Sequence, residues 1–397
     1  MRLTHLLLTD YRNIERLEIE FPERTGVFVG ENAQGKSNIL EAVYMLATLR
    51  AVRAEQDAQV IRRAALDDVL PAARVVGQAV TAEGPLKVEV TLTARPGPNG
   101  PIATKTVKVN GVAKRVSAAV GRLTAVFFTA DDLHLIDGSP GTRRRYLDLM
   151  LAQANAGYGA ARSRYERVLT QRNHLLKRIR EGAAKPDEMP YWDQELAANG
   201  AVLFDRRAKA LDVMSRLAQE AHARLAPGEH LSVHYRPRLE PLTTDPARAG
   251  EDAVREAFAR ALSSALRRDV AAGMTLQGPH RDDVFLALGD LPAAGFASRA
   301  QQRTIALSLR LAEAQFLRER RGDPPLLLLD DILSEMDAGR RDSVLAALGD
   351  VDQMLVTGTD WDRFPGSFLE GASLFEVAAG SARLREAGVP GPRRDPS

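Results

Sequence analysis

Alternating hydrophobic and polar residues predict β-strands in the N-terminal part of the chain. Leu17, Ile19 and Phe21 alternate with glutamates, as in a strand with one buried face. Residues 27–29 form an apolar run that stops at Gly30, which is typical of a buried strand entering a tight loop. After Lys36 the apolar residues recur at helical spacing, so a helix is expected next. Further strands are predicted at 88–92, at 107–109 before the turn dipeptide Asn110-Gly111, and at 125–128.

From Thr142 to Ala272 the pattern predicts almost only helix. Apolar residues recur at heptad-like spacing over 196–225 and at every fourth residue over 254–266, which fits either internal helix packing or a coiled coil with a partner. Prolines at 186, 190, 227, 237 and 241 predict that this region is divided into short helices.

The C-terminal third returns to strands around one long helix. Strands are expected at 284–286, 326–329 and 354–356, and a helix over 298–321. The run 326–329 is wholly apolar, as in a parallel strand buried on both faces. The segment 381–397 is rich in proline, glycine and arginine, so a flexible tail is expected.

Composition excludes several classes of protein. A chain of 397 residues suggests two or three domains. The absence of cysteine excludes disulfides, cysteine-ligated zinc and a cysteine nucleophile. No apolar stretch approaches the roughly 18 residues of a membrane span, and the first residues do not resemble a signal peptide. We therefore expect a cytoplasmic protein without a membrane partner.

Positive charge is concentrated in one segment. The whole chain carries a net charge of +2, but residues 142–180 contain ten basic and two acidic residues, a net charge of +8. Such a segment suits the binding of a polyanion, although a solvated helix face would have the same composition.

The most specific motif is the octapeptide Gly30 to Ser37, which fits the phosphate-binding pattern G-x-x-x-x-G-K-[ST]. Glycines let backbone amides converge on phosphates, and the following helix directs its positive end at them. Lys36 is expected to reach the β- and γ-phosphates of a nucleotide, and Ser37 to ligate Mg²⁺. The alternative is an accidental glycine-rich turn. The candidate nucleotide-binding residues of the loop are Gly30, Glu31, Asn32, Ala33, Gln34, Gly35, Lys36, Ser37 and Asn38.

Two aspartates at the end of the apolar strand complete a hydrolytic site. Asp330 is expected to hold the Mg²⁺ through water, and Asp331 to act as general base on the attacking water. Lys36, Asp330 and Asp331 are therefore the candidate catalytic residues. The other possibility is an ordinary acidic helix cap after a strand. Almost 300 residues separate Ser37 from Asp330, so a large insert that carries the basic helices lies between them.

Ser298 precedes the long helix as part of Ser-Arg-Ala-Gln-Gln-Arg. A serine in that place is usually a helix cap. Alternatively, its hydroxyl and the helix dipole could face a γ-phosphate.

The order of these motifs resembles the ATP-binding-cassette ATPases, and within them the RecF family of the DNA-repair branch with SMC-type heads. The similar runs are DYRNIE at 10–15, GENAQGKSNILEA at 30–42, RAVR at 50–53, SPGTRRRYLD at 139–148, QGPHRDD at 277–283, SRAQQRT at 298–304 and LLLLDDILSEMD at 326–337. The resemblance implies an α/β fold: an ABC-type P-loop ATPase head of mixed β-sheets and helices with an inserted helical arm. The expected domains are 1–141 with the P-loop, a basic arm at 142–272, a second ATPase part at 273–380, and the tail 381–397.

The resemblance also implies roles for further residues. Ser298, Arg299 and Gln301 would contact ATP held by a second copy of the chain, and Ser334–Asp337 would join the two sites. Arg53 would contact phosphate, and Arg12 and Asn13 would lie near the adenine, although surface solvation explains these arginines equally well. Ala300 stands where the family usually has glycine, and Thr357 is a weak substitute for the histidine of transporter ATPases. His280 is expected to be structural.

The function implied is an ATP-dependent homodimeric clamp on double-stranded or gapped DNA, with weak DNA-stimulated ATP hydrolysis. It would serve DNA repair, recombination, replication restart and the SOS response, with a RecR-type mediator as partner and recombinase loading as the outcome. The expected cofactors are ATP and Mg²⁺. The alternatives are the ATPase subunit of a membrane transporter and a small-molecule P-loop kinase. The candidate DNA-binding residues are Arg143, Arg144, Arg162, Arg164 and Arg167.

Overall fold

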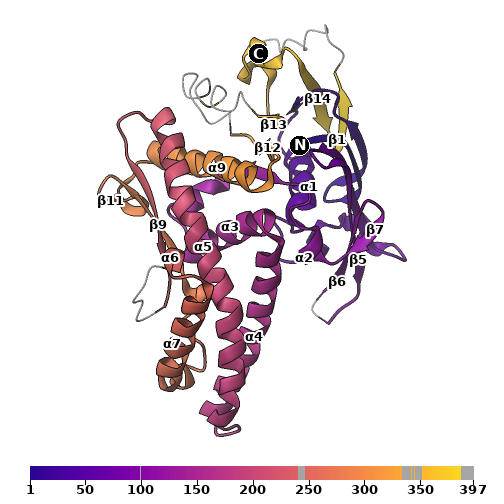
Figure 1. Ribbon diagram of the computed structural model, residues 1–397. Helices are drawn as coiled ribbons and strands as arrows, with labels where there is room; N and C mark the ends of the chain where they lie inside the picture. The colour runs from indigo at the N-terminus through magenta and orange to yellow at the C-terminus, as the bar shows by residue number, and fades with distance from the viewer. Residues whose placement is uncertain (99, 240–245, 333–340, 342–343, 345–350, 386–397) are drawn as a thin grey trace. The chain divides into compact units, whose positions relative to one another are not determined.

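The computed structural model describes residues 1–98, 100–239, 246–332, 341, 344 and 351–385 (Figure 1). The chain divides into two compact units, each with its own hydrophobic core. The first unit comprises Met1–Ala130 and Arg321–Ser397, and the second comprises Asp131–Arg320. Among the described residues, no helix is long and apolar enough to span a membrane.

An antiparallel sheet of six strands forms one layer of the first unit. Its order is β2-β1-β4-β5-β6-β7. The expected turn at Asn110-Gly111 is present: both residues have positive φ, and Val109 pairs with Val112 across it. The strands are β1 (Arg2–Tyr11), β2 (Ile14–Glu20), β4 (Ala72–Thr81), β5 (Gly84–Arg95), β6 (Ile102–Val109) and β7 (Val112–Lys114).

A second, mostly parallel sheet carries the strands that precede the motifs. Its order is β15-β14-β3-β13-β12-β8, and only β15 runs antiparallel to its neighbour. The strands are β3 (Thr25–Val29), β8 (Ala125–Phe128), β12 (Leu326–Leu329), β13 (Met354–Gly358), β14 (Ala372–Ala378) and β15 (Ser381–Leu384). The start of the expected tail is therefore a strand, because Ser381–Leu384 pair with β14.

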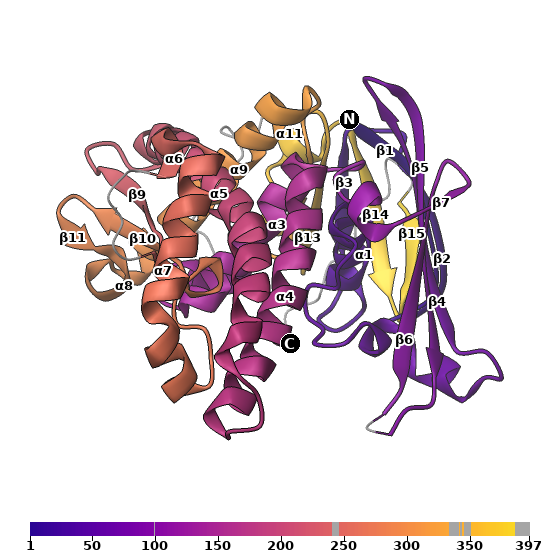
Figure 2. The ribbon, with the colours of Figure 1, turned by 60° about the horizontal axis from the view of Figure 1, so that its bottom comes forward.

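Helix α1 (Lys36–Thr48) packs between the two sheets of the first unit (Figure 2). Eleven of its thirteen residues are buried, because both flanks of the helix face strands. The P-loop precedes this helix, so the loop is anchored at both ends by buried structure. Short elements complete the unit: α2 (Val116–Ala119), α11 (Gly366–Leu369) and the 3₁₀ turns η1 (Asp57–Val60), η2 (Arg63–Asp67) and η7 (Trp361–Arg363).

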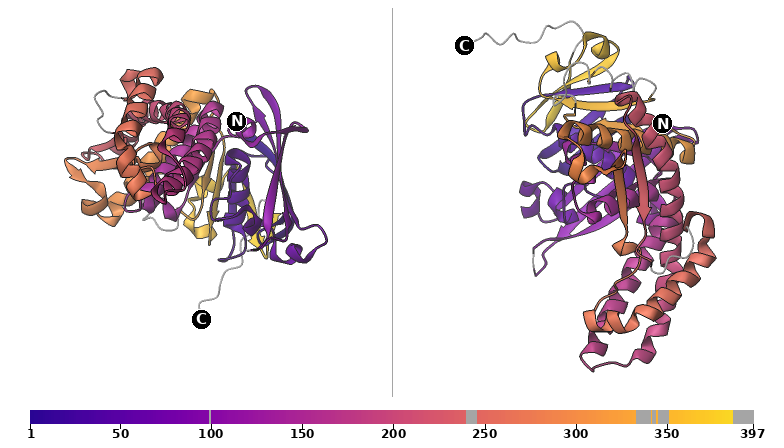
Figure 3. Two further views of the ribbon diagram at one scale, coloured as in Figure 1. Left: turned by 90° about the horizontal axis from the view of Figure 1, so that it is seen from below. Right: turned by 90° about the vertical axis from the view of Figure 1, so that its left-hand side faces the viewer.

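The second unit consists mainly of helices. Helices α4, α5 and α7 run side by side (Figures 1 and 3). The helices are α3 (Pro140–Ala154), α4 (Ala156–Arg180), α5 (Met189–Leu225), α6 (Pro246–Ala249), α7 (Glu251–Ala272), α8 (Ala293–Phe296) and α9 (Arg299–Arg321). A three-stranded antiparallel sheet of β9 (Leu231–Arg236), β10 (Asp283–Leu288) and β11 (Leu291–Pro292) and the 3₁₀ turns η3 (Ala130–Leu135), η4 (Pro186–Glu188) and η5 (Pro279–Arg281) accompany them.

The expectation of short helices over 142–272 is wrong for α5, which has 37 residues and spans about 55 Å. Pro190 lies in its first turn, where proline costs no helical hydrogen bond, and Pro227 follows its end. Strand β9 also interrupts the region that was expected to be helical. Most residues of the heptad-like stripe, from Leu196 to Ala221, are buried in the core of this unit, which favours internal packing over a partner coiled coil.

The unit boundaries differ from the expected domains at two places. The first boundary falls at 130/131 rather than 141/142, and residues 273–320 belong to the helical unit rather than to the second ATPase part. The reason is physical: β10 pairs with β9, and Ile305, Leu309 and Phe316 of α9 join the helical core.

Candidate functional site

The P-loop follows β3, and its two glycines are required by a close backbone approach at Gly30 and by a positive φ at Gly35. A Cβ atom on Gly30 would lie 2.1 Å from the carbonyl oxygen of Val377. Gly35 caps α1 with φ of +113°, a conformation that residues with a side chain rarely adopt. The loop therefore presents its backbone at the N-terminus of α1, the arrangement that binds phosphates.

Lys36 folds back onto the loop. Its Nζ donates to the carbonyl oxygens of Gly30 at 2.6 Å and Glu31 at 2.7 Å. Burial lowers the pKa of the Lys36 ammonium, and the nearby Asp331 and Asp330 carboxylates act in the opposite direction. The two carbonyls hold the amine at the loop, where incoming phosphate oxygens would replace them as acceptors.

Asp330 joins the motifs that are farthest apart in the sequence. Its Oδ1 accepts hydrogen bonds from Ser37 Oγ at 2.6 Å and from Thr357 Oγ1 at 3.0 Å, and its Oδ2 pairs with Arg53 at 3.1 Å. The carboxylate is almost fully buried at the end of β12. A hydroxyl and a carboxylate oxygen side by side are hard ligands of the kind that Mg²⁺ prefers, so the predicted pair Ser37 and Asp330 fits that ion.

Asp331 has a left-handed backbone, with φ of +56°. Its amide donates to Thr357 Oγ1 at 2.9 Å, so Thr357 contacts both aspartates and is itself buried. The hydroxyl of Thr357 is therefore engaged with the acidic pair, and its assignment as a nucleotide contact stays a prediction. The expected joining segment, Ser334–Asp337, lies outside the described residues.

Arg12, Asn13 and Arg53 all lie at the loop or its helix. Asn13 donates from Nδ2 to the carbonyl of Gln34 at 3.2 Å and accepts from Asn38 Nδ2 at 2.8 Å. The structure thus brings together the predicted residues of the first unit.

The sequence reasoning missed Glu41, a carboxylate on α1 that is only 2% exposed. Its Oε2 pairs with Arg12 at 3.1 Å, and its Oε1 pairs with Arg53 at 3.2 Å. One buried anion therefore holds both candidate arginines. Its position on the buried side of an amphipathic helix, among apolar residues, was the signal that could have revealed it.

Ser298 and Gln301 lie in the second unit, at the start of α9. The amide of Gln301 donates to Ser298 Oγ at 3.2 Å, and the amide of Ser298 donates to Gln301 Oε1 at 2.9 Å. This is a capping box, so Ser298 does cap the helix, and its assignment as a phosphate contact stays a prediction. Ala300 lies in the same turn, and Arg299 pairs with Asp137 at 2.8 Å.

The five candidate DNA-binding arginines have different environments. Arg143 makes two hydrogen bonds to Asp283, Arg144 donates to the carbonyl of Asp282, and Arg162 pairs with Asp148 and Glu166. These three arginines therefore have intramolecular partners. Arg164 and Arg167 on α4 have exposed side chains, and Nε of Arg167 donates to the carbonyl of Ser163 in the same helix at 3.3 Å.

The QGPHRDD run forms a buried polar corner ahead of β10. Tyr165 donates its hydroxyl to His280 Nδ1 at 2.6 Å, and His280 Nε2 donates to the carbonyl of Thr275 at 3.1 Å. Burial lowers the pKa of His280 to about 4, so the ring is neutral in the folded protein. Beside it, Arg207 pairs with Asp148 and Asp282. These contacts support a structural role for His280.

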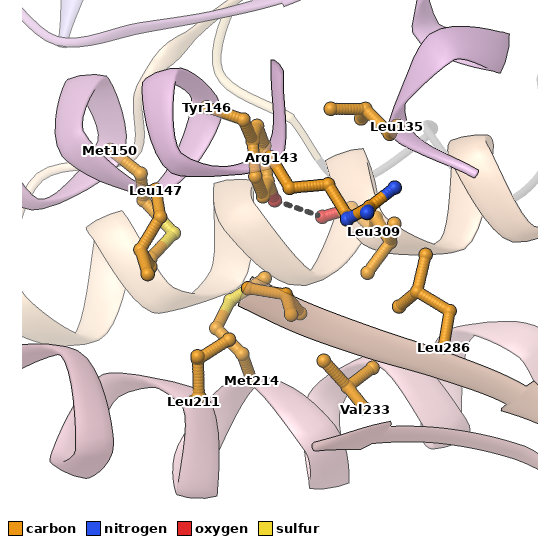
Figure 4. Close-up of a pocket in the computed structure, with 11 residues that line it drawn as sticks. Leu135, Arg143, Tyr146, Leu147, Met150, Leu211, Met214, Val233, Leu286 and Leu309 are labelled. Atoms are coloured by element: carbon orange, nitrogen blue, oxygen red, sulfur yellow. Dashed lines mark hydrogen bonds between the residues drawn. The ribbon is translucent and has the colours of Figure 1, made fainter. Parts of the chain in front are cut away.

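Neither the cavity described below nor the acidic and histidine side chains form a second candidate site in the described part of the chain. A cavity among α3, α5, β9, β10 and α9 has an apolar lining and a volume of about 20 Å³, which is room for about one water molecule and none for a nucleotide (Figure 4). Within the part of the chain that the structure describes, no cluster of three or more His, Cys, Asp or Glu residues could hold a metal ion. The loop around Gly30–Ser37 with Asp330 thus remains the candidate site.

Known proteins match this chain over nearly its whole length. The model of the RecF/RecN/SMC N-terminal domain matches residues 2–365. The DNA replication and repair protein RecF of Roseiflexus castenholzii is 39% identical over 394 residues, which cover 96% of this chain and 99% of the relative. A solved structure of the recombination mediator protein RecF with ATP, in the RecFOR pathway, is 28% identical with a TM-score of 0.85, and the match covers 97% of this chain and 98% of that one.

A more distant match concerns the fold alone. The Smc head domain of Pyrococcus furiosus is 15% identical with a TM-score of 0.51, over 97% of this chain and 96% of that one. The predicted fold class, an ABC-type α/β ATPase head, is confirmed. The chain belongs to the RecF family of DNA replication and repair proteins, within the larger group of SMC-type ATPase heads.

Proposed function

We propose that the protein is an ATP-controlled switch of DNA repair that binds DNA as a homodimer and hydrolyses ATP slowly. The observation that carries this proposal is the 2.6 Å hydrogen bond from Ser37 to Asp330, which joins the P-loop to the acidic strand across 293 positions of sequence. The relative solved with ATP supports the choice of nucleotide.

The nucleotide would bind with its phosphates over the backbone amides of residues 30–35. Lys36 would exchange its two carbonyl partners for phosphate oxygens. Ser37 and Asp330 would hold Mg²⁺, which supplies charge neutralisation on the β- and γ-phosphates. Asp331 would accept a proton from the attacking water.

Ser298 of a second copy of the chain would complete the nucleotide site. Its Oγ accepts from the amide of Gln301, so its own hydroxyl hydrogen remains available to donate to a γ-phosphate. Such a contact exists only with ATP, and this differential contact would shift the population from monomer to dimer. Loss of the γ-phosphate would then release the dimer.

DNA binding is proposed for the exposed arginines of α4 rather than for all five candidates. Arg164 and Arg167 extend from one helix of the helical unit and offer phosphate contacts without base readout. Arg143, Arg144 and Arg162 would contribute less, because they are half-buried and contact with DNA would require them to leave their carboxylate or carbonyl partners. A RecR-type mediator, recombinase loading and a cytoplasmic location are part of the proposal, and the RecFOR setting of the solved relative supports the first two.

Sedimentation with and without ATP tests the switch. The wild-type protein is expected to dimerise with ATP and not with ADP. Ser298→Arg should abolish the dimer without affecting ATP binding to the monomer. Ser263→Arg, on the exposed face of α7, is the matched control and should dimerise normally. A protein that stays monomeric with every nucleotide would refute the switch.

DNA binding is tested separately by titration at several salt concentrations. Replacing Arg164 and Arg167 with glutamine should lower the slope of log affinity against log salt by about two, one unit for each lost phosphate contact. The matched control replaces Arg255 and Arg260, two exposed arginines of α7. Equal losses in the two variants would mean that α4 has no special role.

A further inference from the structure

The first turn of α9, the helix that Ser298 caps, is held by a side chain from outside that helix. The carboxamide of Gln301 accepts from the amide of Ser298 through Oε1, and donates from Nε2 to Oε1 of Glu229 at 2.9 Å. Glu229 lies between α5 and β9. Gln301 thus uses one end of its amide for the capping box and the other for Glu229.

Glu229 is held in turn by a buried histidine. Its Oε2 lies 3.1 Å from Nε2 of His222, and Nδ1 of His222 lies 3.1 Å from Oγ of Ser308 in α9. His222 is fully buried in the last turns of α5. The last turns of α5 are therefore tied to α9 at two places, directly at Ser308 and through Glu229 at Gln301; the two helices lie together in Figure 1.

The hydrogen bond to Glu229 assigns the proton of the His222 ring. A carboxylate accepts only, so Nε2 of His222 must donate to Glu229. Oγ of Ser308 lies 3.1 Å from Nδ1 of His222 and 2.7 Å from the carbonyl oxygen of Thr304, and its one hydrogen can be donated to either of them. A neutral imidazole with its hydrogen on Nε2 satisfies the contact with Glu229. Burial lowers the pKa of His222 and outweighs the opposite effect of Glu229, which agrees with a neutral ring.

We propose that Glu229 is a positioning residue for Ser298. By fixing the amide of Gln301 it fixes the capping box, and the capping box keeps Oγ of Ser298 as an acceptor with its hydrogen directed outward. His222 keeps the carboxylate in place. The proposal rests on the proposed function only in its last step, where the oriented hydroxyl contacts ATP of the partner copy.

The structure predicts which substitution should be tolerated. Glu229→Ala removes the acceptor of Gln301, and the unpaired amide should raise the dissociation constant of the ATP-bound dimer about tenfold. Glu229→Gln should remain close to wild type. Its carbonyl can accept from Gln301, and its amide can donate to Nε2 of His222. The proton of His222 then moves to Nδ1 and is donated to Ser308, whose own hydroxyl can donate to the carbonyl of Thr304, 2.7 Å away.

The experiment has three readouts on the full chain. The first is the ATP-dependent dimer constant by sedimentation. The second is amide hydrogen exchange of residues 298–302 without nucleotide, which Glu229→Ala should accelerate about tenfold. The third is the ¹⁵N spectrum of His222, which should report an Nε2–H ring in the wild type and an Nδ1–H ring in Glu229→Gln. The matched control is Glu220→Ala, which removes an exposed ion pair from α5.

The outcomes separate the two proposals. If the wild type does not dimerise with ATP, the proposed function fails. Hydrogen exchange and the tautomer of His222 still test the role of Glu229 in that case, because neither measurement depends on the dimer. If Glu229→Ala exchanges at 298–302 no faster than Glu220→Ala, the positioning role is overturned. It is also overturned if Glu229→Gln weakens the dimer and accelerates exchange at 298–302 as much as Glu229→Ala does. The hydrogen bond that glutamine can still accept from Gln301 would then have no effect.

Discussion

Glu41 offers the sharpest test of how the nucleotide site is built. Its carboxylate is 2% exposed and pairs with Arg12, which is 18% exposed, and with Arg53, which is 39% exposed. Glu41→Gln keeps the size of the side chain but removes its charge. The two guanidinium groups then lie near each other without the anion between them.

The expected loss of stability follows from these exposures. Breaking a fully buried ion pair costs about 3–5 kcal/mol, and an exposed pair is worth about 0–1 kcal/mol. Because the anion is buried and the cations are partly solvated, we expect about 2 kcal/mol. For a unit of this size that is a decrease in Tm of roughly 6 °C. If both arginines contact the nucleotide, their displacement should weaken ATP binding about tenfold.

Calorimetry and titration with a fluorescent ATP analogue measure the two effects. The matched control is Glu89→Gln on β5, which breaks a two-bond pair with Arg74 in the antiparallel sheet, at 3.2 and 3.0 Å. This control should lower Tm and leave ATP affinity unchanged. If Glu41→Gln affects ATP affinity no more than Glu89→Gln does, Glu41 only stabilises the fold and the reasoning is refuted.

Three further predictions concern single residues. Gly30→Ala should destabilise the protein by about 1–3 kcal/mol and abolish ATP binding, because the new Cβ would meet the carbonyl of Val377; a thermal scan and an ATP titration check this. Asp330→Asn should remove the dependence of ATP affinity on Mg²⁺, so that titrations with Mg²⁺ and with EDTA agree. His280→Asn should remove a contribution to the free energy of unfolding that is lost in acid. The pKa of His280 is lowered to about 4, whereas in the unfolded chain it is about 6.5, so protonation favours the unfolded state. The stability contributed by the neutral ring is therefore complete above pH 6.5 and is lost as the pH falls to 4. At pH 5 the loss is about 2 kcal/mol. Denaturant unfolding at pH 5 and pH 7 measures the difference, and equal pH dependence in wild type and variant would contradict it.

The elements of the first unit were predictable because each has a simple local cause. The apolar run at 326–329 became a buried strand, and the dipeptide Asn110-Gly111 became a turn, because side-chain period and backbone preference act within a few residues. Ser37 and Asp330 were both expected to serve the same Mg²⁺, and the structure brings them together because β3 and β12 belong to one mostly parallel sheet.

The helical unit was harder to predict because its contacts are long-range. The proline count favoured short helices, but proline in a first turn does not break a helix, as Pro190 in α5 shows. The sequence alone does not distinguish the arginines of 142–180 from one another. Their environments differ only in the folded chain, where Arg143 pairs with Asp283 and Arg162 pairs with Asp148. Net charge therefore overestimated the surface available for DNA.

The charged residues at the P-loop also contact one another. Arg53 spans Glu41 and Asp330, and both oxygens of Asp330 already accept hydrogen bonds. A guanidinium carries five N–H groups, so the pairs of Arg53 with Glu41 and Asp330 do not exclude the predicted contact with a phosphate. If Asp330 binds the predicted cation, the cation would compete with Arg53 for that carboxylate. Glu41 would then remain the partner of Arg53, because no cation is predicted at that carboxylate. A buried carboxylate for which the sequence predicted no role would then orient the arginine both with and without nucleotide.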